Sequence, residues 1–238
     1  MKRWIFSFIL LCSSHFVMAQ REFTGIAKYI MTVEGDSAKR VDSMAVVFGK
    51  SKIKIIFYLP NTGNWGIPSE KVFIDDLLTD STFDIEPDSG TYTVYPIKKA
   101  DQYEFSNTSR YDAVKRYICF VYKANPQKLD REKIISAECL GSIDFYNNGI
   151  KNYSFLGVQP LIVDNRVVMD YTVVQKDGLK PKFYLYDIKK IENVEEYFSL
   201  EGLIRRWSCK FSSGLIEHLS SYFPLMAAFS FVSVGDLK

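Results

Sequence analysis

The chain has 238 residues, 30 of them basic and 28 acidic; 47% are hydrophobic and 15% aromatic. Such balanced charge, without a basic stripe, excludes a general nucleic-acid binder, which needs surplus Lys and Arg on one face. The length suffices for one large domain with a substantial core, and abundant Tyr and Phe favour β structure.

Residues 1–19 have the plan of a secretory signal peptide. Two basic residues precede an apolar run at residues 4–11, and Ala19 ends a segment with small residues at positions −3 and −1. The run is too short to span a bilayer, which takes about 20 residues. We expect cleavage after Ala19 and a mature protein, residues 20–238, in the periplasm or outside the cell.

Period-two alternation of apolar and polar residues dominates from Phe23 to Ile188 and predicts antiparallel strands in a single domain. Residues 49–51 interrupt the pattern and fit either a hairpin or a glycine bulge in one bent strand. Strands are expected at 23–33, 44–48, 53–59, 72–78, 82–85, 91–94, 117–122, 139–146, 150–156, 167–175 and 182–188.

Turn residues predict how these strands connect. Residues 86–90 (Glu-Pro-Asp-Ser-Gly) and the pair Asp177-Gly178 predict tight hairpins. Asn148-Gly149 is the strongest hairpin signal and predicts that strands 139–146 and 150–156 pair. Residues 60–68, which contain two prolines and one Trp, predict an exposed loop, and the polar stretch 100–113 also predicts a loop.

The pattern changes to helical spacing over residues 191–223. Asn193 and Glu196 resemble a capping box, Ser199 is a candidate cap for a second short helix through Trp207, and Pro224 ends a third. Residues 219–234 carry no charge but are too short and too close to Pro224 to span a membrane. We predict that these short helices cover one face of the sheet and that the mature chain has no transmembrane span.

The sequence contains no recognisable catalytic or cofactor motif, so we predict no enzyme, no cofactor and no metal. The mature chain has one histidine, His218, and three scattered cysteines, too few for a zinc site. Cys119 and Cys139 lie on neighbouring predicted strands and are the best candidates for a disulfide if one forms. Asp75 and Asp76 are adjacent on a strand, so their side chains point to opposite faces and cannot act as a pair.

Residues 23–188 resemble a group of secreted Bacteroidota proteins similar to the lipoprotein carriers of the LolA/LolB type. Turn and strand motifs carry the resemblance: residues 25–29 (GIAKY), 34–36 (EGD), 42–50 (DSMAVVFGK) and 88–93 (DSGTYT). It implies a half-open antiparallel β-barrel with helices at its mouth, and an apolar ligand, a lipid or a lipoprotein as partner.

A large antiparallel sheet must cover its apolar face, either completely or around a ligand cavity. Side chains on the apolar faces of the predicted strands are the candidates for lining such a cavity, although ordinary core packing is the commoner role for any one of them: Tyr29, Met31, Phe48, Ile55, Phe57, Phe145, Met169 and Tyr171.

Three functional hypotheses remain open. The first is a non-enzymatic binding protein that holds a lipid or another apolar ligand in a half-barrel. The second is an envelope interaction module without a ligand cavity, in which Trp65 contacts another envelope protein. The third, a hydrolase, requires two carboxylates converging in one cleft, and nothing in the sequence points to such a pair.

Overall fold

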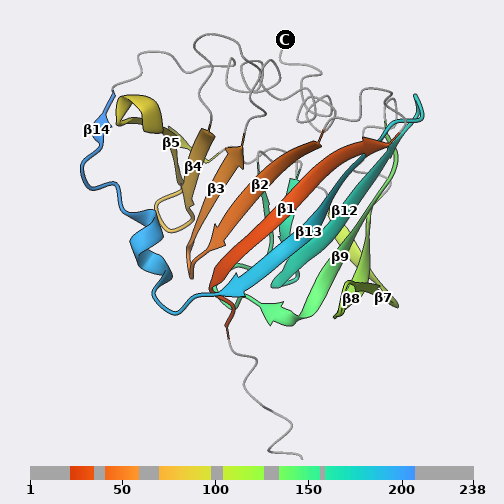
Figure 1. Cartoon of the computed structure of the whole chain (residues 1–238). Coiled ribbons are helices and arrows are strands. Elements are labelled where there is room, and N and C mark those ends of the chain that lie inside the picture. The colour runs from red at the N-terminus through yellow and green to blue at the C-terminus, as the bar shows by residue number, and fades with distance from the viewer. Residues whose placement is uncertain are drawn as a thin grey trace, which may run out of the picture.

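The structure is a computed structural model that describes residues 22–34, 41–58, 70–97, 104–125, 134–155 and 159–206 (Figure 1). The predicted signal peptide, the predicted loop with Trp65, His218 and the chain after residue 206 lie outside the described residues, so the predictions made for them remain predictions.

The described chain forms one open, mainly antiparallel sheet, which confirms the predicted fold class. The first seven elements are β1 (Gly25–Glu34), β2 (Val41–Phe48), β3 (Lys52–Tyr58), β4 (Glu70–Asp76), β5 (Ser81–Glu86), the 3-10 helix η1 (Pro87–Ser89) and β6 (Thr91–Pro96). The rest are β7 (Phe105–Val114), β8 (Tyr117–Ala124), β9 (Ile134–Tyr146), β10 (Tyr153–Phe155), β11 (Gln159–Val163), β12 (Arg166–Gln175), β13 (Lys180–Lys190), the 3-10 helix η2 (Val194–Phe198) and β14 (Ile204–Arg205).

Strand β13 joins two successive antiparallel runs into one sheet. The strand order is β14-β6-β5-β4-β3-β2-β1-β13-β12-β9-β8-β7, and β10 and β11 lie off this path. Both predicted hairpins after β5 and β12 are present, and residues 49–51 form the hairpin between β2 and β3. Gly90 takes φ +62 at the end of η1, a left-handed conformation that glycine adopts at little cost.

The two faces of the sheet carry separate apolar clusters. Alternation sends Val46, Phe48 and Ile55 to the inner face and Val47 and Ile56 to the outer face. The inner face holds the larger cluster, to which β1–β4 and β7–β13 all contribute. The outer face of β2–β6 is covered by the segment around η2, whose Val194 and Phe198 are buried against it.

The C-terminal region therefore covers one face of the sheet as predicted, but the described part of it is not α-helical. Residues 194–198 form a 3-10 helix, and the Asn193 side chain makes no capping hydrogen bond. The predicted helix from Ser199 through Trp207 is wrong over residues 199–206, where β14 pairs in parallel with β6 instead. Among the described residues, no helix combines the length and hydropathy that crossing a membrane requires.

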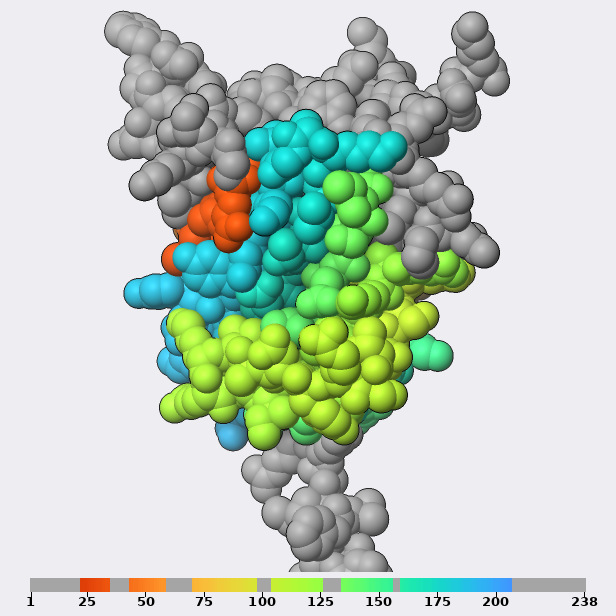
Figure 2. Space-filling view, turned by 90° about the vertical axis from the view of Figure 1, so that its right-hand side faces the viewer, coloured from red at the N-terminus to blue at the C-terminus, as the bar shows by residue number. Residues whose placement is uncertain are grey.

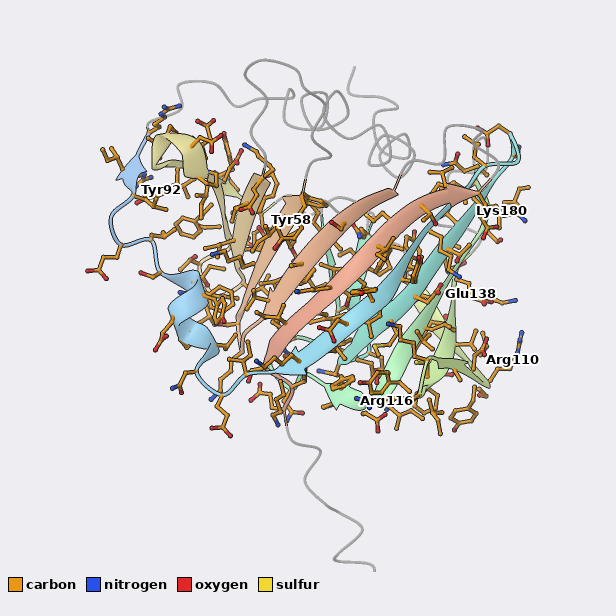
Figure 3. All side chains as sticks on the ribbon, viewed as in Figure 1. Tyr58, Tyr92, Arg110, Arg116, Glu138 and Lys180 are labelled. Atoms are coloured by element: carbon orange, nitrogen blue, oxygen red, sulfur yellow. The ribbon has the colours of Figure 1, made fainter. Side chains whose placement is uncertain are left out.

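The prediction of a loop at residues 100–113 is wrong for residues 105–113, because β7 occupies them. This strand is the edge of the sheet, and most of its side chains face solvent on both sides, so apolar alternation is absent. Arg110 on β7 and Arg116 in the following turn are exposed (Figure 3). A register shift between Asn107 and Tyr111 further interrupts this edge, a device that limits pairing with other chains.

Cys119 and Cys139 lie on neighbouring strands as predicted, but both thiols are free and buried. The β8–β9 register places Cys119 opposite Ser142 and Cys139 opposite Tyr122, so the two cysteines do not face each other. Burial raises the pKa of the Cys119 thiol to about 11 and that of Cys139 well above its usual value.

Candidate functional site

The eight residues predicted to line a cavity lie together on the inner face, which we call the inner wall. Seven of them are at most 1% exposed, and the eighth, Phe145, is partly buried against the same cluster. Whether any of them contacts a ligand stays a prediction. The inner wall comprises Tyr29, Met31, Phe48, Ile55, Phe57, Phe145, Met169 and Tyr171.

Tyr29 fixes one end of the inner wall. Its ring packs edge-on against Phe183 with centroids 5.2 Å apart, and Phe183 also packs against Tyr171 at 5.4 Å. The Tyr29 hydroxyl donates a hydrogen bond of 2.9 Å to the carbonyl of Val168, so its polar atom is satisfied inside the core. Burial raises the pKa of Tyr29, which keeps the phenol neutral.

The inner wall is covered by a detour of the chain between β9 and β12. We call residues 147–155 and 159–163 the cover; β10 and β11 pair with each other within it, and β11 forms a two-residue hairpin with β12. Phe155 of the cover packs against both Phe57 and Phe73, with ring centroids 5.5 Å and 5.3 Å away, and these two rings also contact each other at 6.4 Å. Figure 1 shows this detour behind β1 and β2, off the main strand path.

The prediction that strands 139–146 and 150–156 form a hairpin is wrong. Strand β9 pairs with β8 and β12, and the hairpin turn nearby is Asp164-Asn165, whose φ angles of 50° and 61° suit a two-residue turn. Asn147 is fully buried, and its Oδ1 accepts hydrogen bonds from Gly149 N and Ile150 N, each at 3.0 Å. The Asn-Gly sequence therefore directs the chain into the cover.

The cover is also tied to the turn between β2 and β3. The side-chain amide of Asn147 donates a 3.0 Å hydrogen bond to Gly49 O, and a Cβ on Gly149 would lie 2.0 Å from Lys50 O. Only glycine permits this approach of two backbones.

A buried hydrogen bond joins the cover to β4. The Tyr153 hydroxyl donates to Asp75 Oδ2, and both side chains are almost completely buried. Burial raises the pKa of Asp75, although the hydrogen bonds from Thr82 and Tyr153 oppose the shift. Asp76 lies on the opposite face with Lys52 3.7 Å away, which confirms that the adjacent carboxylates point apart.

Gln159 begins β11 within the cover, and its side chain is fully buried. Its Nε2 contacts the Met44 sulfur at 3.8 Å, and its Oε1 accepts no hydrogen bond from any described residue. An unsatisfied amide oxygen in a core costs about 1–3 kcal/mol. The cover is thus held by specific contacts but carries an internal energetic penalty.

Sequence reasoning missed the cover, and with it Asp75, Tyr153 and Phe155 as residues of the inner side. Phe183 obeys the alternation of β13, so its inner position was accessible from sequence, whereas Phe73 lies in the continuous buried run of β4, which shows no alternation. The described residues contain no group of His, Cys, Asp and Glu arranged to hold a metal ion.

No protein-family model matches the chain, and no curated protein matches it either. Solved structures that resemble it include PNGF-II at 15% identity and a TM-score of 0.49, with 77% of this chain and 31% of that chain covered. An uncharacterised conserved protein from Thermus thermophilus shows 8% identity and a TM-score of 0.48, with 80% and 94% covered. This chain therefore spans about a third of the length of PNGF-II.

The similar structures also include the LolA superfamily protein NE2245 from Nitrosomonas europaea, the family type named by the sequence resemblance. It shares 7% identity at a TM-score of 0.38, with 75% of this chain and 91% of that chain covered. These likenesses assign the chain to no family.

Proposed function

We propose that the protein is a non-enzymatic binding protein of the cell envelope that holds an apolar ligand, such as the acyl chain of a lipid or lipoprotein, against the inner wall. The observation that carries the proposal is that, among the described residues, a separate chain detour covers this wall and neither a second sheet nor a helix does so. The described part of the site thus has two components, the inner wall, which belongs to the main sheet, and the cover, which lies off the main strand path.

The inner wall has the chemistry that a hydrocarbon chain requires. Its rings and methionines present apolar surface, and the Tyr29 hydroxyl is already bonded to backbone. Each methylene that moves from water to such a surface contributes about 0.8 kcal/mol. A long acyl chain would therefore gain enough free energy to compete with the cover for the wall.

In this proposal the cover is the part of the site that the ligand displaces. Strands β10 and β11 have three and five residues, and β11 meets β12 through two residue pairs. Release of Gln159 into water would remove its unsatisfied oxygen from the core. We infer that the ligand enters by displacing Phe155 from its contacts with Phe57 and Phe73.

The test is titration of the purified mature protein, residues 20–238, with the fluorescent fatty acid cis-parinaric acid. Phe155→Ala should raise the affinity about tenfold, because less apolar contact must be broken before the probe binds. The matched control is Phe198→Ala, which removes a buried ring from the outer face and should lower stability without changing affinity.

Two results would overturn the proposal. One is no probe uptake by either the parent protein or Phe155→Ala. The other is an equal change of affinity in Phe155→Ala and Phe198→Ala, which would place the probe elsewhere or reflect general loosening. Native mass spectrometry of protein from its own host should in addition show a bound lipid mass.

One observation favours the second candidate function, an envelope interaction module without a ligand. Seven of the eight inner-wall residues are already at most 1% exposed, so the wall is satisfied without any ligand. Protein that is bare in native mass spectrometry and takes up no fatty acid would favour this candidate. Its proposed contact, Trp65, lies outside the described residues.

A further inference from the structure

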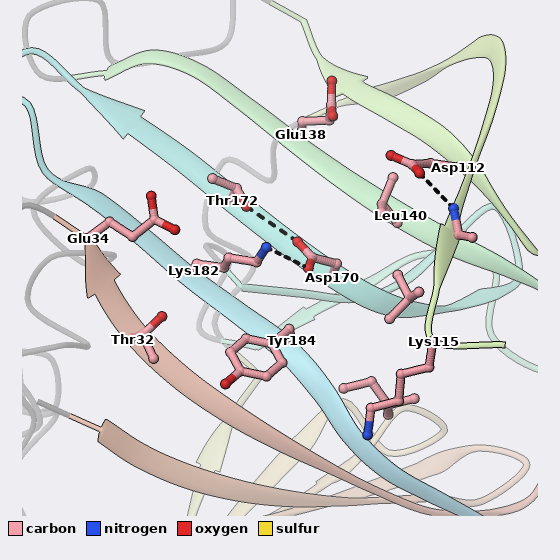
Figure 4. A pocket seen from close by; sticks show the side chains of 13 residues that line it. Thr32, Glu34, Asp112, Lys115, Glu138, Leu140, Asp170, Thr172, Lys182 and Tyr184 are labelled. Carbon is pink, nitrogen blue, oxygen red and sulfur yellow. Dashed lines mark hydrogen bonds and ion pairs between the residues drawn. The ribbon is translucent and has the colours of Figure 1, made fainter. Parts of the chain in front are cut away.

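A groove of about 760 Å³ lies on the outer face of the sheet, on the side away from the inner wall (Figure 4). Strands β1, β13, β12 and β9 form its floor, and the hairpin of β7 and β8 bounds it. Figure 2 shows this hairpin in yellow-green as a ridge next to the cyan and green strands. None of the eight inner-wall residues borders the groove, whose volume lies within the range of small-molecule sites, about 300–1,000 Å³.

The turn between β7 and β8 contacts β13, three strands away in the sheet order. The Lys115 ammonium donates a hydrogen bond to Tyr186 O and also lies 4.9 Å from the centroid of the Tyr186 ring. The bounding hairpin is thereby attached to the strand that forms the floor.

The groove is lined by carboxylate, ammonium and hydroxyl groups, and its floor contains one aromatic ring, that of Tyr184. Tyr184 lies beside Asp170 and Lys182, and the hydroxyls of Thr32 and Thr172 come from the strands on either side of β13 (Figure 4). Lys182 and Asp170 form an ion pair of 3.0 Å, and Thr172 donates to the same carboxylate. The Tyr184 ring lies 5.9 Å from the Lys182 ammonium.

This chemistry disfavours two ligand classes, although Val114, Leu140 and Leu185 add apolar groups to the lining. A hydrocarbon would desolvate the Lys182–Asp170 pair without giving it any hydrogen bond, which is costly. An anion would find neither lysine free, because Lys115 is bonded to Tyr186 and Lys182 to Asp170. The carboxylates of Asp112 and Glu138, which also line the groove, would repel it. The groove thus suits a ligand that is uncharged, rich in hydroxyl groups and provided with an apolar face.

We propose that the groove binds a neutral saccharide chain, with a sugar ring stacked on Tyr184 and its hydroxyls donating to carboxylates and threonine oxygens. Sugars combine an apolar ring face with hydroxyls at the rim, and this combination matches an aromatic floor between polar walls. The site is independent of the proposed apolar ligand, because it lies on the opposite face and shares no residue with the inner wall.

The experiment is a glycan-array screen of the mature protein, followed by NMR titration with maltotetraose, chitotetraose and the strongest array hit. At least one oligosaccharide should bind at millimolar concentration or below. Tyr184→Ala should weaken binding about tenfold, since stacking on one aromatic ring contributes on the order of 1.4 kcal/mol. The matched control, Tyr197→Ala, removes a partly exposed tyrosine at η2, away from the groove, and should leave binding unchanged.

The charged groups supply the second arm of the test. Asp112→Asn and Glu138→Gln keep an acceptor oxygen, so saccharide binding should change by less than about threefold and show little salt dependence. The proposal is overturned if no oligosaccharide binds, or if Tyr184→Ala and Tyr197→Ala behave alike. Preference for a tetralysine peptide over all sugars, lost in Asp112→Asn and at high salt, would equally overturn it and indicate a cation site.

Discussion

At the residue scale, the most informative pair is Tyr153 and Asp75, which joins the cover to β4 through one buried hydrogen bond. A carboxyl group in a core is more easily protonated than one in water, and the raised pKa of Asp75 reflects this burial. The pair therefore couples the attachment of the cover to pH.

The pKa of Asp75 is raised in the folded protein above its usual value of 3.8. Asp75 should therefore make the protein less stable as the pH rises from 3.8 through this raised pKa. Over this window the folded state binds more protons than the unfolded state, so the free energy of unfolding falls with increasing pH. Asp75→Asn removes this contribution. Urea denaturation of both proteins between about pH 4 and pH 8 should show the parent losing stability relative to the variant.

The difference between the two proteins isolates Asp75, because other buried acids such as Asp170 contribute equally to both. Tyr153→Phe should cost about 1–3 kcal/mol, since the carboxyl loses its donor while remaining buried. Parallel pH profiles for the parent and Asp75→Asn would show that this carboxyl is not desolvated in solution.

At the scale of the element, the cover depends on how closely its first turn approaches the β2–β3 turn. Gly149→Ala would place a Cβ 2.0 Å from Lys50 O, a backbone atom that cannot rotate away. We expect destabilisation of about 1–3 kcal/mol from this overpacking, measured by urea denaturation.

The control for Gly149→Ala is Gly178→Asn in the β12–β13 turn. Gly178 has φ +86 and open space around its Cα, and Asn tolerates positive φ better than other residues with a side chain. Its effect should stay within about 0.5 kcal/mol. Equal effects of the two variants would mean that the contact with Lys50 is not tight.

The elements differ in how far the sequence predicts them. Strands with one face in the core, such as β1 and β3, show period-two alternation because that face must be apolar, and they were found. Strand β7 has little buried surface and hence little alternation. The pair Asn148-Gly149 predicts a local hairpin between two neighbouring strands. Asn147 instead bonds to the β2–β3 turn, a tertiary contact that sequence spacing does not reveal.

The same limit applies to the candidate sites. The inner wall follows from alternation, so its residues were predicted to lie together, and they do. The outer groove depends on the β7–β8 turn reaching Tyr186, and sequence separation gives no indication of that contact. Contacts between elements that are far apart in the sequence therefore could not be predicted without the structure.

At the scale of the whole molecule, β13 is the strand on which the sheet depends. It pairs with β1 on one side and with β12 on the other, and so unites β1–β6 with β7–β12. Tyr184 lies within both ladders, opposite Ile30 and Asp170. Loss of a backbone hydrogen bond at Tyr184 should therefore destabilise both β1–β6 and β7–β12.

Tyr184→Pro should destabilise the protein by about 3 kcal/mol or more, because proline lacks the N–H that a central strand needs. Native-state hydrogen exchange should show reduced protection in β3 and β9 together. Tyr184→Ala removes the same side chain but keeps the backbone, so it serves as the control. Loss of protection confined to β13 and its two neighbours would contradict the central role of this strand.

The late position of β13 in the chain has a consequence for biosynthesis. A ribosome that adds about 5–20 residues per second needs on the order of 10 s to travel from Glu34 to Lys180. During that interval the nascent β1 offers an unpaired edge, which is open to mispairing with other polypeptides. Any factor that covers this edge until the last long strand has emerged would therefore reduce such mispairing.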